Sequence, residues 1–166
     1  MKQTLFFNNA KLLAEHFTIV PLLYGSVGLA YVTKETLDAD DIDILIPEIF
    51  LKERWPDFKT VLKGEGYALV DEQEHTFEKD GVCYAYASIE ELENFAQIPL
   101  SQIRVENSRG VCFKVLSLEQ YLKVYTASSK DGYRIDVRQK KDGEKIELIK
   151  RCLENLANTT GESTEQ

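Results

Sequence analysis

Hydrophobic side chains recur along the first part of the chain with two different spacings. Between Leu5 and Phe17 they fall at roughly helical intervals, which predicts a helix with one apolar face. Residues 19–24 form an almost continuous apolar run, which is typical of a buried strand. Gly25 and Ser26 follow directly and indicate a turn. The chain is therefore expected to begin with a helix, a strand and a glycine turn.

Helical spacings and strand-like apolar runs continue to alternate after this turn. Residues 27–34 are compatible with a short helix, and residues 41–47 form a second apolar run that Pro47 ends as a strand. Residues 50–64 again carry apolar side chains at helical intervals and close on Gly64. The first 64 residues therefore predict helices and strands in alternation.

The middle of the chain is rich in β-prone residues. Residues 67–88 contain short β-prone runs, and Asp80-Gly81 between two of them is a strong hairpin signal. Residues 103–117 predict a second hairpin that turns near residues 107–110. Both hairpins are expected to extend the sheet formed by the earlier strands.

Helices are predicted after each of these hairpins. Ser88, with Glu91 three residues on, can form a capping box at the start of a short helix. Ser117 can likewise cap a helix over residues 118–129, and residues 143–157 form a strongly amphipathic last helix.

These elements predict a single domain of the α/β (α+β) class, with a mixed β-sheet flanked by helices. We expect the domain to cover residues 1–157, with C-terminal helices from about residue 117. Residues 158–166 contain no large apolar side chain and are expected to form a flexible tail.

Charge and cysteine content indicate which classes of partner and which cellular compartment to expect. Asp and Glu number 28 against 20 Lys and Arg, a net charge of −8, so the chain as a whole repels nucleic acids and anionic lipid headgroups. Apolar runs stay well short of a membrane span. Cys83, Cys112 and Cys152 lie far apart and are expected to be free thiols in a reducing compartment. We therefore expect a cytoplasmic protein without a membrane or nucleic-acid partner.

The acids of the second strand are its most informative feature. Residues two apart on a strand point to the same face, so Asp41 and Asp43 project together, about 6 to 7 Å apart. Such a pair on a partly buried surface is unfavourable unless a cation lies between the carboxylates, and Mg²⁺ is the natural candidate. The alternative is an edge strand whose acids deter aggregation.

The glycine turn favours the cation interpretation. Gly25 and Ser26, at the start of a helix, can offer backbone N–H groups and a hydroxyl to an anion. A phosphate site next to a metal site indicates a nucleoside triphosphate bound with Mg²⁺.

The motif as a whole resembles a known signature. Gly25-Ser26, a spacer of 14 residues and Asp41-Ile42-Asp43 are similar to the signature of the DNA polymerase beta-like nucleotidyltransferase superfamily, in the branch of minimal and antibiotic nucleotidyltransferases. This resemblance implies that the two aspartates hold the Mg²⁺ of a nucleoside triphosphate and that the Gly-Ser turn contacts its phosphates. It also implies a third carboxylate, on a neighbouring strand, which activates an acceptor hydroxyl for attack on the α-phosphorus as pyrophosphate leaves.

The third carboxylate is where the chain departs from the family pattern. Residues 80–85, Asp-Gly-Val-Cys-Tyr-Ala, line up with the strand that often carries it and put Ala85 at the acid position. An alanine can neither bind a metal nor take a proton. Glu74, Glu78 or Glu90 could supply the missing base, and we take Glu90 as the candidate catalytic acid beside the pair.

A basic residue that often follows the Gly-Ser turn in the family is also absent. The C-terminal region resembles the helical end of small nucleotidyltransferases, so its cations are candidates for phosphate binding, chiefly Lys130 and Arg134. The other candidates are Lys123, Arg138, Lys140 and Lys141. Ordinary solvated helix charges are the simpler interpretation of any single one. His75 is a possible metal ligand or base but is expected to be structural.

Three functional hypotheses follow. The first is an enzyme that transfers a nucleotidyl group from a nucleoside triphosphate to a hydroxyl of a small molecule or a protein. The second is a catalytically degenerate protein of the same fold that binds a nucleotide or a partner, in a toxin–antitoxin or regulatory pair. The third is an unrelated α+β domain whose acid pair decorates its surface. The aspartates favour the first hypothesis, and Ala85 favours the second.

Overall fold

The computed structural model describes the backbone of residues 2–129 and 135–165, and the side chains of residues 2–129 and 142–158. Helices and strands follow the predicted order, and the fold class is confirmed. The helices are α1 (Lys2–Phe17), α2 (Gly25–Thr33), α3 (Trp55–Gly64), α4 (Glu91–Ala96), α5 (Leu118–Ser129) and α6 (Ile135–Glu165), with 3₁₀ turns η1 (Glu48–Leu51) and η2 (Leu100–Gln102). The strands are β1 (Leu22–Tyr24), β2 (Asp41–Ile46), β3 (Ala68–Asp71), β4 (Thr76–Lys79), β5 (Val82–Ser88), β6 (Arg104–Ser108) and β7 (Val111–Val115).

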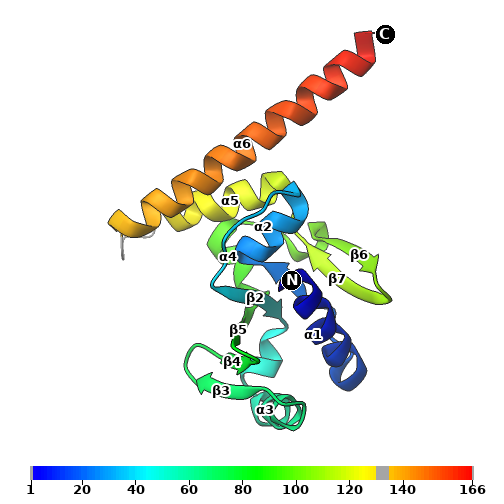
Figure 1. The fold of residues 1–166 in the computed structure, drawn as a ribbon, viewed down its shortest axis with the longest axis vertical. Helices are drawn as coiled ribbons and strands as arrows, with labels where there is room; N and C mark the ends of the chain where they lie inside the picture. The colour runs from blue at the N-terminus through cyan, green and yellow to red at the C-terminus, as the bar shows by residue number, and fades with distance from the viewer. Residues whose placement is uncertain (1, 130–134, 166) are drawn as a thin grey trace.

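The strands form one mixed sheet in the order β3-β4-β5-β2-β1-β7-β6 (Figure 1). Strand β2 lies between β1, to which it is antiparallel, and β5, to which it is parallel. The two predicted hairpins are confirmed as β4–β5 and β6–β7. Asp80 and Gly81 both have positive φ at the first turn, as a tight two-residue hairpin requires. The acidic strand β2 therefore lies in the middle of the sheet, which excludes the edge-strand interpretation of its acids.

Each face of the sheet carries its own hydrophobic core. Ile42, Ile44 and Ile46 are fully buried on the face that α1 and α3 cover. Leu22 and Leu45 point to the other face, into a core completed by α4, α5 and α6. Because side chains alternate along a strand, the odd-numbered Asp41 and Asp43 lie on the face of Leu45. The acids thus share a face with α5 and α6, which pack against each other above the sheet (Figure 1).

A buried hydroxyl fixes α5 on β1. Tyr121 is completely buried, and its hydroxyl donates a hydrogen bond of 3.1 Å to the carbonyl oxygen of Leu23. The same hydroxyl occupies the place where a Cβ on Gly28 would lie, so α2 can approach α5 only with a glycine at this position. This contact ties α5 to β1 and α2, the two elements that surround the glycine turn.

The two predicted capping boxes have different outcomes. At the start of α5, the Gln120 amide N–H donates to Ser117 Oγ at 3.2 Å, and the Ser117 N–H donates to Gln120 Oε1 at 2.9 Å, so this box is confirmed. The box predicted for Ser88 and Glu91 is wrong. Helix α4 has Glu90 as its N-cap and no capping side-chain hydrogen bond, because the Ser88 hydroxyl faces the Glu90 carboxylate instead.

The C-terminal helix is the longest element of the chain. Helix α6 packs along α5 and continues past it, so that its last turns extend beyond the rest of the molecule (Figure 1). Its backbone is helical through Glu165. A domain boundary at residue 157, with a flexible tail from residue 158, stays a prediction. Within the described residues, no helix has the length and apolar character needed to span a membrane.

Candidate functional site

The first residues of β2 bring two carboxylates together on one face of the sheet. Asp41 and Asp43 are partly buried, whereas Ile42 between them is fully buried on the opposite face. The pKa of Asp43 is raised to about 6, chiefly by burial and then by the neighbouring charge of Asp41, while Lys145 opposes the rise. The pair therefore concentrates negative charge that the described side chains only partly neutralise.

Gly25 is in direct contact with this pair. Strand β1 is antiparallel to β2 and pairs Tyr24 with Asp43, so the residue after Tyr24 lies beside the Asp43 side chain. The backbone of Gly25 has a φ of 62°, a conformation that favours glycine. A Cβ built on Gly25 would collide with Asp43 Oδ2. The glycine turn and the second aspartate, 18 positions apart along the chain, thus form one site.

The start of α2 points its backbone toward the same place. Helix α2 begins at Gly25, and among the described residues no side chain caps its first turn. The free N–H groups of a helix start carry partial positive charge and bind anions. Ser26, in this first turn, lines a cleft beside the aspartates. The arrangement offers N–H groups and a hydroxyl to an anion such as a phosphate.

The neighbouring strand gives the aspartates no further acid. The parallel register of β5 pairs Cys83 with Asp41 and Ala85 with Asp43, and paired residues share a face. Ala85 thus lies directly beside Asp43, where the family resemblance places an acid. Cys83 and Ala85 are both small and partly exposed.

The three acids considered as replacements lie elsewhere. Glu78 faces Cys83 from β4, on the far side of β5, which puts its Cα about 10 Å from that of Asp41. Glu74 is exposed in the turn before β4. Glu90 lies beyond the opposite end of β5 and accepts a hydrogen bond of 2.6 Å from the Glu48 backbone N–H. The structure therefore does not bring Glu90 to the aspartate pair.

Helices α5 and α6 bring side chains to the site that the sequence analysis missed. Tyr125 of α5 and Asp142 of α6 are both buried, and Lys145 of α6 lies close enough to lower the pKa of Asp43. Asp142 falls four residues before Ile146 and seven before Ile149, on the stripe of α6 where helical spacing predicts apolar residues. An acid on an otherwise apolar stripe was the one signal that could have identified it.

Two tyrosines link these helices to the aspartates. Burial raises the pKa of Tyr24, and the charges of Asp43 and Asp142 raise it further. The pKa of Tyr125 is also raised, by burial first and then by Tyr24, Asp43 and Asp142. Both phenols therefore lie within electrostatic reach of a carboxylate of the sheet and of a carboxylate of α6.

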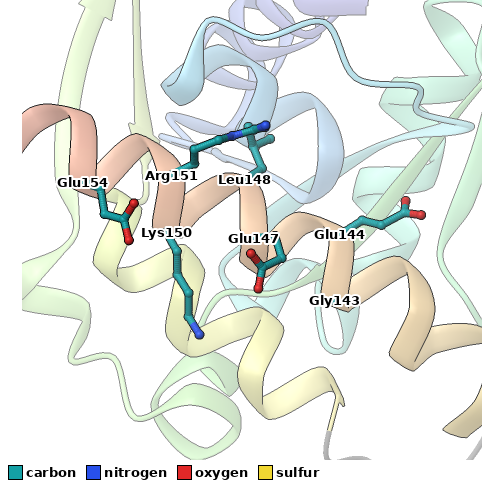
Figure 2. Close-up of a pocket in the computed structure, with 7 residues that line it drawn as sticks. All are labelled: Gly143, Glu144, Glu147, Leu148, Lys150, Arg151 and Glu154. Atoms are coloured by element: carbon teal, nitrogen blue, oxygen red, sulfur yellow. The ribbon is translucent and has the colours of Figure 1, made fainter.

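A cleft of about 710 Å³ opens next to these groups. It lies between Ser26, the loop of residues 35–40 and one side of α6, from which Lys145 and Arg151 line it. Figure 2 shows Arg151 leaving α6 in a different direction from Lys150. The hollow drawn in that figure, about 720 Å³, is lined by side chains of α6 as far as the described residues are concerned. The cleft therefore combines a helix start, two cations and an acidic loop.

The basic residues chosen from the sequence do not include the two that line this cleft. Lys130 and Arg134 lie outside the described residues, as do the side chains of Arg138, Lys140 and Lys141. Lys123 lines a separate groove beside Phe95. The ring of His75 packs edge-on against Trp55 with centroids 4.7 Å apart, which supports the expected structural role.

The donor set fits a magnesium ion that is shared with a ligand. Among the side chains that the structure describes, no three His, Cys, Asp or Glu residues come together around a possible metal position. Mg²⁺ is commonly held by one or two carboxylates, with phosphates and waters completing its shell. Asp43, desolvated by burial and repelled by the neighbouring Asp41, matches that requirement together with Asp41.

A sequence relative covers almost the whole chain. The chain is 38% identical over 150 residues to the uncharacterized protein YnaI of Bacillus subtilis (strain 168), an alignment that covers 90% of this chain and 96% of YnaI. No protein-family model matches the chain.

Solved structures with a similar fold are nucleotidyltransferases. The structure of ANT(2″)-Ia in complex with adenylyl-2″-tobramycin matches with a TM-score of 0.60 and 15% identity, over 92% of this chain and 90% of that one. The lincosamide antibiotic adenylyltransferase LnuA, with lincomycin bound, matches with a TM-score of 0.55 and 17% identity, over 90% and 96% of the two chains. The chain therefore belongs to the same family as YnaI, and its fold is that of the nucleotidyltransferases.

Proposed function

We propose that the protein is a Mg²⁺-dependent nucleotidyltransferase that moves a nucleotidyl group from a nucleoside triphosphate to a hydroxyl of a small molecule. One observation carries the proposal: the Asp43 carboxylate lies where a Cβ atom on residue 25 would be, so only glycine fits there. This contact puts a pair of carboxylates against an uncapped helix start, and the two features together suit a metal-bound phosphate chain.

In this proposal each group of the site has a separate task. Asp41 and Asp43 hold Mg²⁺, which when bound neutralises charge on the triphosphate and on the departing pyrophosphate. The N–H groups at Gly25 and Ser26 contact phosphate oxygens. Lys145 and Arg151, which line the cleft, add the positive charge that the residues directly after Ser26 lack.

The acceptor is proposed to occupy the cleft. Its volume of about 710 Å³ is suited to a small molecule. ANT(2″)-Ia holds an adenylylated tobramycin and LnuA holds lincomycin, which supports a small hydroxyl compound as the acceptor class. The acidic residues of the cleft, Glu35, Asp38, Asp40 and Glu144, would favour an acceptor with positive charge.

A second candidate function is nucleotide binding without transfer. It is favoured by Ala85, because no carboxylate stands next to Asp43 on β5 to take the proton of an acceptor hydroxyl. Such a protein would act by binding a nucleotide or a partner, for example in a toxin–antitoxin or regulatory pair.

Pyrophosphate release separates the two functions. The natural chain is incubated with Mg²⁺, each of the four common nucleoside triphosphates and a panel of hydroxyl compounds that includes tobramycin and lincomycin. Acceptor-dependent pyrophosphate that disappears in Asp41→Asn and Asp43→Asn supports the transferase. Mg²⁺-dependent nucleotide binding without any release supports the binding protein.

The variant Ala85→Asp adds a direct comparison, because it restores an acid beside Asp43. A gain of turnover in this variant from a silent natural chain would identify the natural chain as the degenerate form. A natural chain that neither binds nucleotide nor releases pyrophosphate would contradict both nucleotidyl transfer and nucleotide binding.

A further inference from the structure

Two buried polar atoms near the aspartates have no hydrogen-bond partner. Among the described residues, neither Asp142 Oδ2 nor the Tyr125 hydroxyl makes a hydrogen bond, although both atoms are shielded from solvent. Asp142 is 6% exposed and Tyr125 is also 6% exposed. Buried polar groups are nearly always paired, because an unpaired one loses its hydration without compensation. Two such atoms in one place indicate a group that is added when a ligand binds.

The two atoms lie in the same electrostatic environment. The charge of Asp142 raises the pKa of Tyr125, and the charges of Asp43 and Asp142 both raise the pKa of Tyr24. Ser26 interacts with the Tyr125 hydroxyl and lowers the pKa of Tyr125, although the contact falls short of hydrogen-bond geometry, which puts the first turn of α2 beside this phenol. Asp142 and Tyr125 therefore lie near each other, and Tyr125 also lies near the helix start and Asp43.

Packing does not explain an acid at this position of α6. Leu148 and Ile149 on the same helix are buried in the core shared with α5, and the spacing of that stripe calls for an apolar residue at position 142. Glu144 and Lys145, two and three residues further along, line the cleft. Asp142 thus lies where the apolar stripe of α6 meets the cleft, at a position that an apolar side chain would fill without an unpaired oxygen.

We propose that Asp142 and Tyr125 together bind a hydroxyl group of the ligand beside Asp41 and Asp43. A carboxylate only accepts hydrogen bonds and a phenol readily donates one, so a hydroxyl, which does both, satisfies the two orphaned atoms at once. The inference rests on the proposed function, because it requires a nucleotide or an acceptor in the same site. The hydroxyl belongs either to the sugar of the nucleotide or to the acceptor.

The test compares three variants of the full chain. Asp142→Asn replaces the carboxylate with an amide of nearly the same size, and Tyr125→Phe removes only the hydroxyl. Glu147→Gln is the control, because Glu147 is exposed on the same helix and Figure 2 shows it on the hollow lined by side chains of α6. The melting temperature of Asp142→Asn is expected to stay close to that of the natural chain, since the amide has nearly the size and shape of the carboxylate. If this variant does not fold, Tyr125→Phe carries the test.

Calorimetry with Mg²⁺ tests the sugar as the source of the hydroxyl. The probes are the common nucleoside triphosphate that binds most tightly and its 2′-deoxy and 3′-deoxy forms. If the sugar supplies the hydroxyl, one deoxy form binds the natural chain about tenfold more weakly. Asp142→Asn and Tyr125→Phe then bind the parent nucleotide about tenfold more weakly and no longer distinguish the deoxy form. Glu147→Gln retains the distinction.

Pyrophosphate release tests the acceptor as the source. In that case the two variants bind all three nucleotides as the natural chain does, but their kcat/KM for the acceptor falls about tenfold or more. The inference is overturned if both variants stay within twofold of Glu147→Gln in nucleotide affinity and in pyrophosphate release while Asp43→Asn abolishes binding. A natural chain that binds no triphosphate overturns the proposed function, and this inference with it.

Discussion

The parallel strands β2 and β5 have acidic side chains near both of their ends. The carboxylates at the two ends differ in the hydrogen bonds that they accept. Past the far end, the Glu90 carboxylate accepts hydrogen bonds from the Glu48 backbone N–H at 2.6 Å and from the Ser88 hydroxyl at 3.4 Å. At the near end, the Asp43 carboxylate makes no hydrogen bond among the described residues, and burial and Asp41 raise its pKa to about 6.

The difference distinguishes Glu90, whose carboxylate stabilises the fold, from Asp43, whose carboxylate can bind a ligand. The charge of Glu90 is neutralised by donors of the protein itself, so it stabilises the start of η1. The charge of Asp43 is desolvated by burial and repelled by Asp41, and Lys145 offsets this only in part, so a cation between the two carboxylates would be favourable. Four variants or conditions test this contrast.

The largest effect is expected from Asp43→Asn. An amide keeps the size of the side chain but removes half of the charge that would hold Mg²⁺. Metal stabilisation of a phosphoryl transfer amounts to several kcal/mol, so turnover should fall by at least about 10²-fold. Pyrophosphate release with Mg²⁺ measures the loss, and Glu90→Gln is the matched control at the other end of the strands. An equal loss of pyrophosphate release in Asp43→Asn and Glu90→Gln would contradict the different roles assigned to the two carboxylates.

Gly25→Ala should disturb the same carboxylate through the backbone. The new Cβ would collide with Asp43 Oδ2, and the φ of 62° is strained for alanine. We expect the free energy of unfolding to fall by about 2 kcal/mol or more, with loss of nucleotide binding. Gly81→Ala is the control, because Gly81 has a φ of 79° but open space around its Cβ position. Its loss should be about 1 kcal/mol from backbone strain alone. Chemical denaturation measures the free energy of unfolding of both variants. Equal losses of stability in Gly25→Ala and Gly81→Ala would contradict the close contact between Gly25 and Asp43.

The raised pKa of Asp43 predicts a pH dependence of stability. The pKa of the Asp43 carboxyl is about 6 in the folded chain and near its ordinary value of 3.8 in the unfolded chain, so between these values the folded chain binds more protons. Stability therefore falls as pH rises through this window and levels off above it. We expect a difference of about 3 kcal/mol between the natural chain and Asp43→Asn to develop across the window. Urea denaturation at several pH values measures it, and parallel curves for the two proteins would contradict the prediction.

Glu90→Gln should have the smallest effect. The amide can still accept a hydrogen bond from the Glu48 N–H but loses the charge-assisted strength of that contact, which amounts to about 1 kcal/mol of stability. Nucleotide binding should stay within twofold of the natural chain, because this carboxylate lies at the other end of the strands. A selective loss of turnover in Glu90→Gln, without a loss of stability, would instead support the catalytic role first considered for it.

The parts of the site that the sequence predicts are those fixed by local spacing. Asp41 and Asp43 share a face because residues two apart on a strand do so, and Gly25-Ser26 forms a turn that leads into a helix. The Asp80-Gly81 hairpin also sets the register of β5 against β4. The position of Ala85 beside Asp43 was implied by the family resemblance and comes from the parallel pairing of β5 with β2.

The rest of the site depends on packing between distant segments. Asp142 and Lys145 reach the aspartates only because α6 lies on α5, whose position is fixed by the Tyr121 hydroxyl on β1. Nothing in the spacing of residues a hundred positions apart encodes that contact. The placement of Glu90 could have been foreseen, since five residues beyond Ala85 on a strand correspond to about 16 Å.

Calorimetric titration of the natural chain with a nucleoside triphosphate tests the central claim most directly. With Mg²⁺ present, we predict one binding site per chain, which disappears when the metal is chelated and in the double variant Asp41→Asn/Asp43→Asn. The double variant should keep the fold, as judged by its melting temperature. Triphosphate binding that is unchanged by removal of the metal or of both carboxylates would contradict the account, as would no binding of any common triphosphate to the natural chain.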